Sequence, residues 1–109
     1  MHPDRPPTAF EEKVYDAARL IPRGKVTTYA LLAKAVGCGS SQAIGQALKR
    51  NIFAPEVPCH RIIKSDLSIG GFGGDHGGPE IQRKLALLKK EGVIFKDGVL
   101  TEPERVYRF

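Results

Sequence analysis

The residues of this 109-residue chain that are best suited to chemistry stand together in the segment Pro58-Cys59-His60-Arg61. A cysteine attacks as its thiolate, which electropositive surroundings favour. Arg61 is permanently charged and His60 can move a proton near neutral pH, so both neighbours favour an activated thiol at Cys59. The alternative is a buried structural cysteine beside a surface His-Arg pair, and the four residues alone do not separate these two interpretations.

Composition narrows the class of protein. Lysine and arginine outnumber aspartate and glutamate by 17 to 12, which gives a formal net charge of +5. Such a charge favours a polyanionic partner, or alternatively a basic surface that keeps the protein in solution. Two cysteines without a C-x-x-C pattern predict neither a disulfide framework nor a structural zinc site, and they fit a reducing cytoplasm or nucleus. No apolar run approaches the ~20 residues of a membrane span, so we expect a single domain over 1–109, not a membrane protein, with 1–7 as a flexible lead.

Four helices and a few short extended segments are predicted to position the chemical residues. Thr8 and Glu11 have the spacing of a capping box at the start of the first helix. Thr27 or Thr28 can cap the second helix and Ser40 the third. The fold class is therefore mainly α with short β segments. The expected elements are helices at about 9–21, 28–36, 41–50 and 80–91, a short strand at 62–63, and a hairpin of 93–95 and 99–100 that turns at Asp97-Gly98.

The second and third expected helices are joined by the tight turn 37–39, and two short helices joined in this way are typical of a helix-turn-helix. An ordinary αα-hairpin is the alternative. On the third helix Gln42, Gln46 and Lys49 share a polar face, with Gly45 at its edge. A glycine inside a helix costs about 1 kcal/mol against alanine, which suggests that core backbone or a ligand approaches closely at Gly45. A polar, uncluttered face on such a helix suits a nucleic-acid groove.

Two charged residues of the fourth expected helix region, Lys84 and Glu91, lie two turns apart at the edge of its apolar stripe. Such positions usually carry solvated charges, but a carboxylate there can also be the partner of a buried histidine. The glycine-rich segment 70–78 before this helix lacks the P-loop pattern. We interpret it either as a plain loop or as a loop that folds over a bound base.

Taken together, these residues resemble the DNA-binding, active-site domain of the O6-alkylguanine-DNA alkyltransferases and their shorter relatives, the alkyltransferase-like proteins. The resemblance runs from about Glu11 to Val93, and the Pro-Cys-His-Arg motif at this spacing from a helix-turn-helix is a specific signal. It implies a winged-helix-like helix-turn-helix domain. The matching segments are 24–29, 42–48, Asn51, 57–63, 71–72, 82–84, 87–88 and 91–92.

The resemblance implies a DNA repair protein that moves an alkyl group from O6-alkylguanine to its own cysteine, once per molecule, without a cofactor or a metal. Cys59 would accept the alkyl group. His60 would remove the thiol proton through a water, and Glu91 would hold the imidazole as its charge partner. Asn51 would brace the turn that carries the cysteine.

The resemblance also implies that the helix-turn-helix binds the minor groove of double-stranded DNA and that the damaged guanine is rotated out of the stack into a pocket. Tyr29 would help to rotate the nucleotide and donate a hydrogen bond to the guanine oxygen as it leaves. Backbone groups of Cys59 and Ile62 would contact the guanine edge. The residues expected at the DNA or at the rotated base are Tyr29, Gln42, Ala43, Gly45, Gln46, Lys49, Arg50, Arg61, Ile62, Phe72 and Lys84.

Two departures from the family pattern support a second hypothesis, a damage sensor. We expect the active-site domain to stand without a preceding domain, as in the alkyltransferase-like proteins, which bind alkylated DNA and hand it to excision-repair proteins. Those proteins usually lack the acceptor cysteine, which is present here as Cys59. The arginine that fills the gap left by the rotated base is Gln42 here, which is shorter and neutral, so we expect weaker base flipping. In either case we expect a monomer.

A third and a fourth hypothesis each depend on a single feature of the chain. A plain helix-turn-helix regulator would make the Pro-Cys-His-Arg segment incidental. A metal site would need ligands from Cys38, Cys59, His60 and His76, whose spacings match no known pattern.

Overall fold

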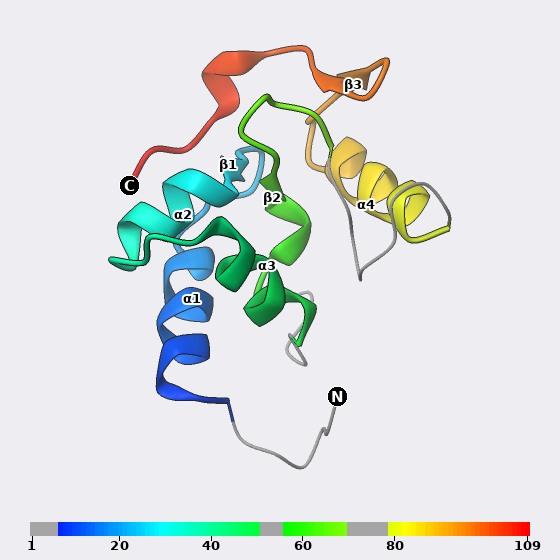
Figure 1. Ribbon diagram of the computed structural model, residues 1–109. Helices are drawn as coiled ribbons and strands as arrows, with labels where there is room; N and C mark the ends of the chain where they lie inside the picture. Colours follow the sequence, from blue (N-terminus) through cyan, green and yellow to red (C-terminus); the bar gives the residue numbers. More distant parts are fainter. Residues whose placement is uncertain (1–6, 51–55, 70–78) are drawn as a thin grey trace.

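The computed structural model describes residues 7–50, 56–69 and 79–109, and these form a mainly helical protein with short strands, as predicted (Figure 1). No helix in these ranges is both long and apolar enough to span a bilayer. The elements in chain order are α1 (Ala9–Arg19), β1 (Thr27–Thr28), α2 (Tyr29–Ala35), α3 (Ser41–Lys49), the 3-10 turn η1 (Cys59–Arg61), β2 (Ile62–Ile63), α4 (Pro79–Lys90), β3 (Phe95–Lys96), β4 (Val99–Leu100) and the 3-10 turn η2 (Pro103–Arg105).

The three N-terminal helices begin at the caps that the sequence predicts. Thr8 and Glu11 form the capping box of α1 through both reciprocal hydrogen bonds. Thr28, rather than Thr27, caps α2 by accepting a hydrogen bond from the amide of Leu31. Ser40 caps α3 in the same way. These caps satisfy amides that have no partner within the helix, so each helix has a defined start.

Helices α1, α2 and α3 pack together around the larger of the two apolar clusters that the described residues form. Ile44 and Leu48 of α3 contribute to this cluster, as does Leu32 of α2. Tyr15 of α1 is also buried, and its hydroxyl donates a hydrogen bond of 2.8 Å to the carbonyl of Ala47. The helix-turn-helix is thereby fixed on α1, and the opposite face of α3 faces outward.

A short parallel sheet joins the two halves of the chain. Strand β1 pairs with β2 in parallel, with Thr27 opposite Ile62. Directly before β1, Val26 forms a parallel bridge with Val106. The hydroxyl of Thr27 donates to the carbonyl of Tyr107 at 2.9 Å, so the C-terminal segment is held against the sheet.

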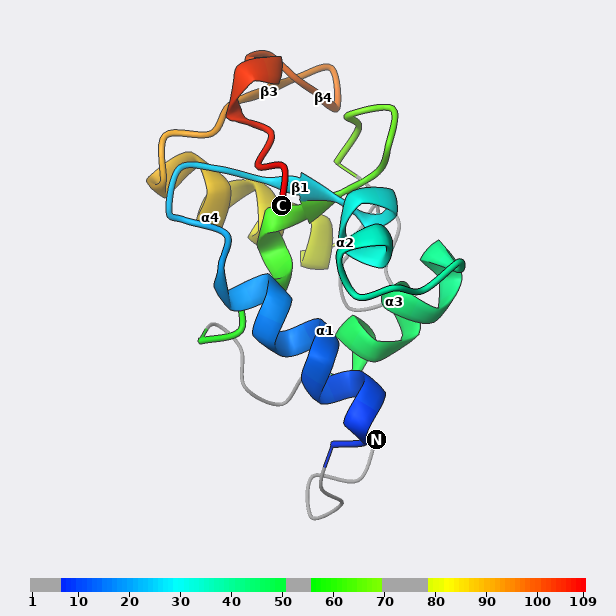
Figure 2. The ribbon, with the colours of Figure 1, turned by 90° about the vertical axis from the view of Figure 1, so that its left-hand side faces the viewer.

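The second apolar cluster lies under α4 and the C-terminal hairpin. It contains Val26, Ile63, Leu88, Val93 and Leu100. The hairpin β3–β4 is antiparallel and turns at 97–98, where both residues have positive φ angles, 52° and 79°. This confirms the predicted turn, since two residues in the left-handed region are typical of the tight turns that join twisted strands. In Figure 1, α4 and strand β3 of this hairpin lie on one side of β1 and β2, with α1 and α2 on the other, and Figure 2 shows the hairpin above β1 and α1 below it.

Candidate active site and nucleic-acid interface

The turn η1 places the chemical residues at the entry to strand β2. The amide of Cys59 donates to the carbonyl of Val57 at 2.9 Å, and the amide of Arg61 donates to the carbonyl of Pro58 at 2.9 Å. These bonds form a tight turn directly before a buried strand. As a result Cys59 is half-buried, whereas His60 is 3% exposed.

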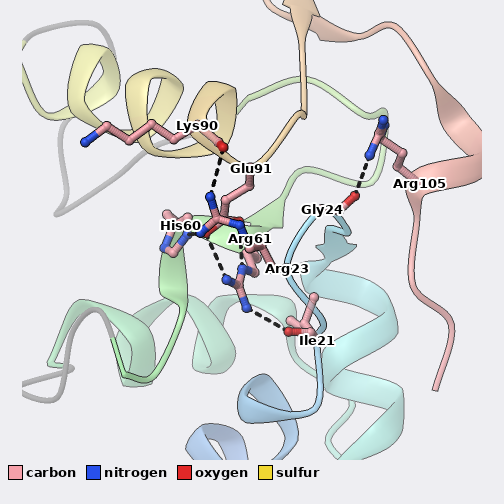
Figure 3. A network of polar contacts seen from close by, with 8 residues as sticks. All are labelled: Ile21, Arg23, Gly24, His60, Arg61, Lys90, Glu91 and Arg105. Atoms are coloured by element: carbon pink, nitrogen blue, oxygen red, sulfur yellow. Dashed lines mark hydrogen bonds and ion pairs between the residues drawn. The ribbon is translucent and has the colours of Figure 1, made fainter.

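His60 and Glu91, which are far apart in the sequence, are joined by a hydrogen bond beneath this turn. Nε2 of His60 lies 3.0 Å from Oε2 of Glu91, the residue that follows α4 (Figure 3). Burial has the largest effect on His60 and lowers its pKa. The contact with Glu91 raises the pKa, but it does not offset burial together with the charges of Arg61 and Lys84, which lower the pKa further. The imidazole is therefore neutral near pH 7, which is the form that accepts a proton.

Arg61 holds the same carboxylate from the other side. Its Nε and Nη2 donate to the two oxygens of Glu91, each at 2.8 Å, and its Nη1 donates to the carbonyl of Ile21 at 2.8 Å. Burial by itself would raise the pKa of Glu91, but the hydrogen bonds from Arg61 and His60 outweigh it and lower the pKa to about 2. The side chain of Arg61, for which the family resemblance implies a DNA contact, thus bonds inward to Glu91 and Ile21, and the DNA contact stays a prediction.

Lys84 of α4 lies inside the protein rather than in solvent. Its side chain has no exposed surface, and Nζ donates to the carbonyl of Ile62 at 2.7 Å. Burial lowers the pKa of Lys84 to about 8, and the nearby Cys59 acts in the opposite direction. At neutral pH most of the lysine is still protonated, so it places a positive charge near the thiol, which favours the thiolate.

Tyr29 reaches the same region from the start of α2. Burial, and after it the charge of the Cys59 thiolate, raise the pKa of the Tyr29 hydroxyl above its usual value. The hydroxyl therefore stays protonated and can donate a hydrogen bond. The structure thus brings Tyr29, Cys59, His60 and Lys84 into one region, with Glu91 behind the histidine.

The outward face of α3 is polar and open. Gln42, Gln46 and Lys49 are exposed, and Gly45 is partly exposed beside them. Among the described residues, nothing lies within 4 Å of the place where a Cβ of Gly45 would stand. No described core backbone approaches this glycine, and the ligand alternative stays open.

The remaining residues expected at DNA take different positions. Ala43 is partly exposed on α3, while Ile62 is buried in β2. Arg50, at the end of α3, has its Nη1 3.4 Å from Oε2 of Glu11. Asn51, Phe72 and the glycine-rich segment 70–78 lie outside the described residues.

The cysteine of the helix-turn-helix turn has a structural role. Sγ of Cys38 accepts a hydrogen bond from the amide of Ser40 at 3.4 Å, directly before α3. Within the ranges that the structure describes, no three histidine, cysteine or acidic side chains gather as metal ligands would. His76 lies outside those ranges.

Comparison with known proteins identifies the family. Residues 9–93 match the family described as 6-O-methylguanine DNA methyltransferase, DNA binding domain, and the chain belongs to this family. It is 41% identical over 86 residues to the methylated-DNA–protein-cysteine methyltransferase of Methanothermobacter thermautotrophicus, covering 79% of this chain and 46% of the relative. It is 43% identical over 88 residues to the protein of the same name from Pyrobaculum aerophilum, covering 81% and 53%. The chain therefore spans about half the length of these curated relatives.

Two solved structures show the same fold in contact with DNA. The Mycobacterium tuberculosis OGT in complex with DNA superposes with a TM-score of 0.69 at 38% identity, over 77% of this chain and 50% of that one. The S. pombe Atl1 in complex with damaged DNA containing O6-carboxymethylguanine gives a TM-score of 0.74 at 34% identity, over 92% of this chain and 95% of that one. The predicted alkyltransferase type of helix-turn-helix domain is thus confirmed.

Proposed function

We propose that this protein repairs DNA by binding O6-alkylguanine and transferring the alkyl group irreversibly to Cys59. The observation that carries the proposal is the half-buried cysteine directly before a buried histidine whose Nε2 lies 3.0 Å from Glu91. This is the arrangement of nucleophile, base and orienting group found at activated thiols. The names of the relatives, which describe transfer from methylated DNA to a protein cysteine, support it.

The proposed step balances without a cofactor. His60 takes the thiol proton, directly or through a water, and the Cys59 sulfur attacks the alkyl carbon. A carbon–sulfur bond forms while the bond from that carbon to guanine O6 breaks, and the electron pair stays on guanine. Guanine then gains a proton, for which the Tyr29 hydroxyl is the proposed donor because its raised pKa keeps it protonated. The thioether is stable, so each molecule acts once.

The exposed face of α3 is the proposed DNA contact. Gln42, Gln46 and Lys49 would face the minor groove, and Gly45 would let the backbone approach it. Phosphates attract cations on this surface, in keeping with the net charge of +5. The proposal places the protein with the DNA of the cell, in a cytoplasm or nucleus.

A second candidate function is a damage sensor that binds O6-alkylguanine without transfer and recruits excision-repair proteins. Two observations favour it: the likeness to Atl1, which covers 95% of that chain, and the neutral Gln42 at the position where the family resemblance places an arginine. The two candidates share the DNA site and differ only in the fate of Cys59.

The test is an intact-mass measurement after incubation with a duplex that contains O6-methylguanine. Transfer predicts a gain of one methylene per chain, on the peptide with Cys59, that is lost in Cys59→Ala and kept in the matched control Cys38→Ala. A retained gel shift with no mass gain would support the sensor instead. If the gel shows no shift and the mass does not increase, both functions are contradicted.

A further inference from the structure

Arg61 is bonded on all three of its nitrogens inside the protein, although it belongs to a basic chain. Its side chain is 16% exposed. Nε and Nη2 meet the two oxygens of Glu91 as a fork, each at 2.8 Å, and Nη1 meets the carbonyl of Ile21 at 2.8 Å (Figure 3). A planar guanidinium matches a carboxylate in this two-pronged geometry, which lysine cannot reproduce.

The fork fixes the direction in which Glu91 presents its oxygens. Glu91 follows the last turn of α4, and its side chain is 7% exposed. With one oxygen on Arg61 Nε and the other shared by Arg61 Nη2 and His60 Nε2, the plane of the carboxylate is set. The bond from Nη1 to Ile21 in turn ties the guanidinium to the segment after α1.

The orientation of Glu91 decides which nitrogen of His60 can act as a base. Because Nε2 faces a carboxylate that stays ionised, Nε2 carries the proton of the neutral ring and Nδ1 carries the lone pair. We propose that Arg61 is a positioning residue for the transfer to Cys59: its fork holds Glu91 against His60 Nε2, so that Nδ1 is the nitrogen that takes the thiol proton. This inference rests on the proposed function and assigns Arg61 a role other than DNA contact.

The charges around His60 show why the carboxylate must be held. Among the described residues, Glu91 is the anion that faces the ring, while Arg61 from the same turn and Lys84 from α4 are cations that oppose an imidazolium. When the ring takes the proton of Cys59, a carboxylate that keeps its contact with Nε2 offsets these two charges. A Glu91 side chain that could rotate away would leave the protonated ring unsupported.

The test uses Arg61→Met, which removes all three contacts and keeps most of the aliphatic stem. We expect ¹⁵N NMR of the His60 ring to show a single tautomer with the proton on Nε2 in the wild type, and a mixture in the variant. We also expect the rate at which iodoacetamide modifies Cys59 to fall by about tenfold, the lower end of the loss that follows removal of the partner that orients a metal-bound histidine. The matched control is Arg23→Gln, which removes a neighbouring exposed arginine that bonds the carbonyl of Lys90 and not Glu91.

A folded Arg61→Met protein with the wild-type tautomer and rate would overturn the inference. If circular dichroism shows that this variant does not fold, Arg61→Lys is the variant that tests the inference. Lysine keeps the positive charge but cannot make the two-point contact with the Glu91 carboxylate. We expect a tautomer mixture and a slower rate there as well, and wild-type values would show that charge alone is sufficient. The NMR spectrum and the iodoacetamide rate are both measured without DNA. If the wild-type protein takes no methyl group from DNA, the proposed function is contradicted, and these two measurements still test the role of Arg61.

Discussion

The contacts of Glu91 with Arg61 and His60 make the stability of this protein depend on pH in the acid range. Burial opposes ionisation, but the hydrogen bonds from Arg61 and His60 outweigh it and lower the pKa of the folded carboxyl group to about 2. In an unfolded chain a glutamate titrates at about 4.3. Because the folded pKa is the lower one, the stabilisation from this group is complete above the unfolded pKa and is lost as the pH falls from there toward the folded value.

We therefore predict that Glu91→Gln lowers the free energy of unfolding at pH 5, and that its deficit against the wild type shrinks as the pH falls toward 2.5. Urea unfolding at several pH values in this range measures the difference. Glu104→Gln, which removes an exposed glutamate of η2, is the control and should show a small, constant difference. A Glu91→Gln deficit that stayed constant over the whole range would contradict the pKa assignment.

The roles of the side chains in the site could be predicted from the sequence only in part. The sequence indicated a nucleophile and a base from the neighbours Cys59 and His60, and the family resemblance suggested Glu91, 31 residues after the histidine. The inward fork of Arg61 had no sequence signal. Consecutive side chains of an extended segment point to opposite sides, and only the 3-10 turn η1 lets His60 and Arg61 reach the same carboxylate.

Helix α3 is the element on which the two explanations for Gly45 can be separated. Its φ is not positive, and nothing described lies within 4 Å of the place where its Cβ would stand. We therefore predict that Gly45→Ala stabilises the protein by up to about 1 kcal/mol, because alanine is the better helix former. Thermal unfolding measures this change. A loss of stability would show that the fold itself needs a glycine here.

A side chain at position 45 should weaken DNA binding, although alanine there should stabilise the fold. A minor groove about 6 Å wide leaves little room for a branched side chain, so Gly45→Leu should weaken binding to an O6-methylguanine duplex by about tenfold, or about 1.4 kcal/mol. Fluorescence anisotropy measures the affinity. The control Ala86→Leu adds a leucine to an exposed position of α4, and an equal loss there would argue against a specific contact at Gly45.

The elements themselves were largely predictable, because their signals are local. Caps at Thr8, Thr28 and Ser40 fixed the helix starts, and Asp97-Gly98 fixed the hairpin turn. The burial of Lys84 was not predictable from helix periodicity, because an edge position is usually solvated. The carbonyl of Ile62 that accepts from its ammonium group belongs to β2, which no pattern within the helix reports.

At the scale of the whole molecule, the site lies where segments far apart in the sequence meet. Arg61 bonds the carbonyl of Ile21, Arg23 bonds the carbonyl of Lys90, and Arg105 from η2 bonds the carbonyl of Gly24 at 3.0 Å (Figure 3). The segment after α1 is thus tied at once to η1, to the end of α4 and to the C-terminal segment. No local pattern in the sequence reports such a junction, so the position of the C-terminal segment could not be predicted.

The placement of charge over the molecule yields the last prediction. Lys49 is exposed on α3, whereas Lys96 is exposed on the β3–β4 hairpin, across the β1–β2 pair (Figures 1 and 2). Lys49→Gln and Lys96→Gln each lower the formal net charge from +5 to +4. If α3 meets the phosphates, only Lys49→Gln should reduce the slope of log affinity against log salt, by about 1, because one fewer counterion is released from the DNA.

Anisotropy titrations of an undamaged duplex between about 50 and 200 mM salt measure both slopes, since phosphate contacts do not depend on the lesion. Equal slopes in the two variants, both lower than in the wild type, would mean that the overall charge attracts DNA without a preferred face. A change confined to Lys96→Gln would place the DNA on the hairpin side and contradict the assignment to α3. Because the two variants carry the same net charge, any difference between them reports where the DNA lies.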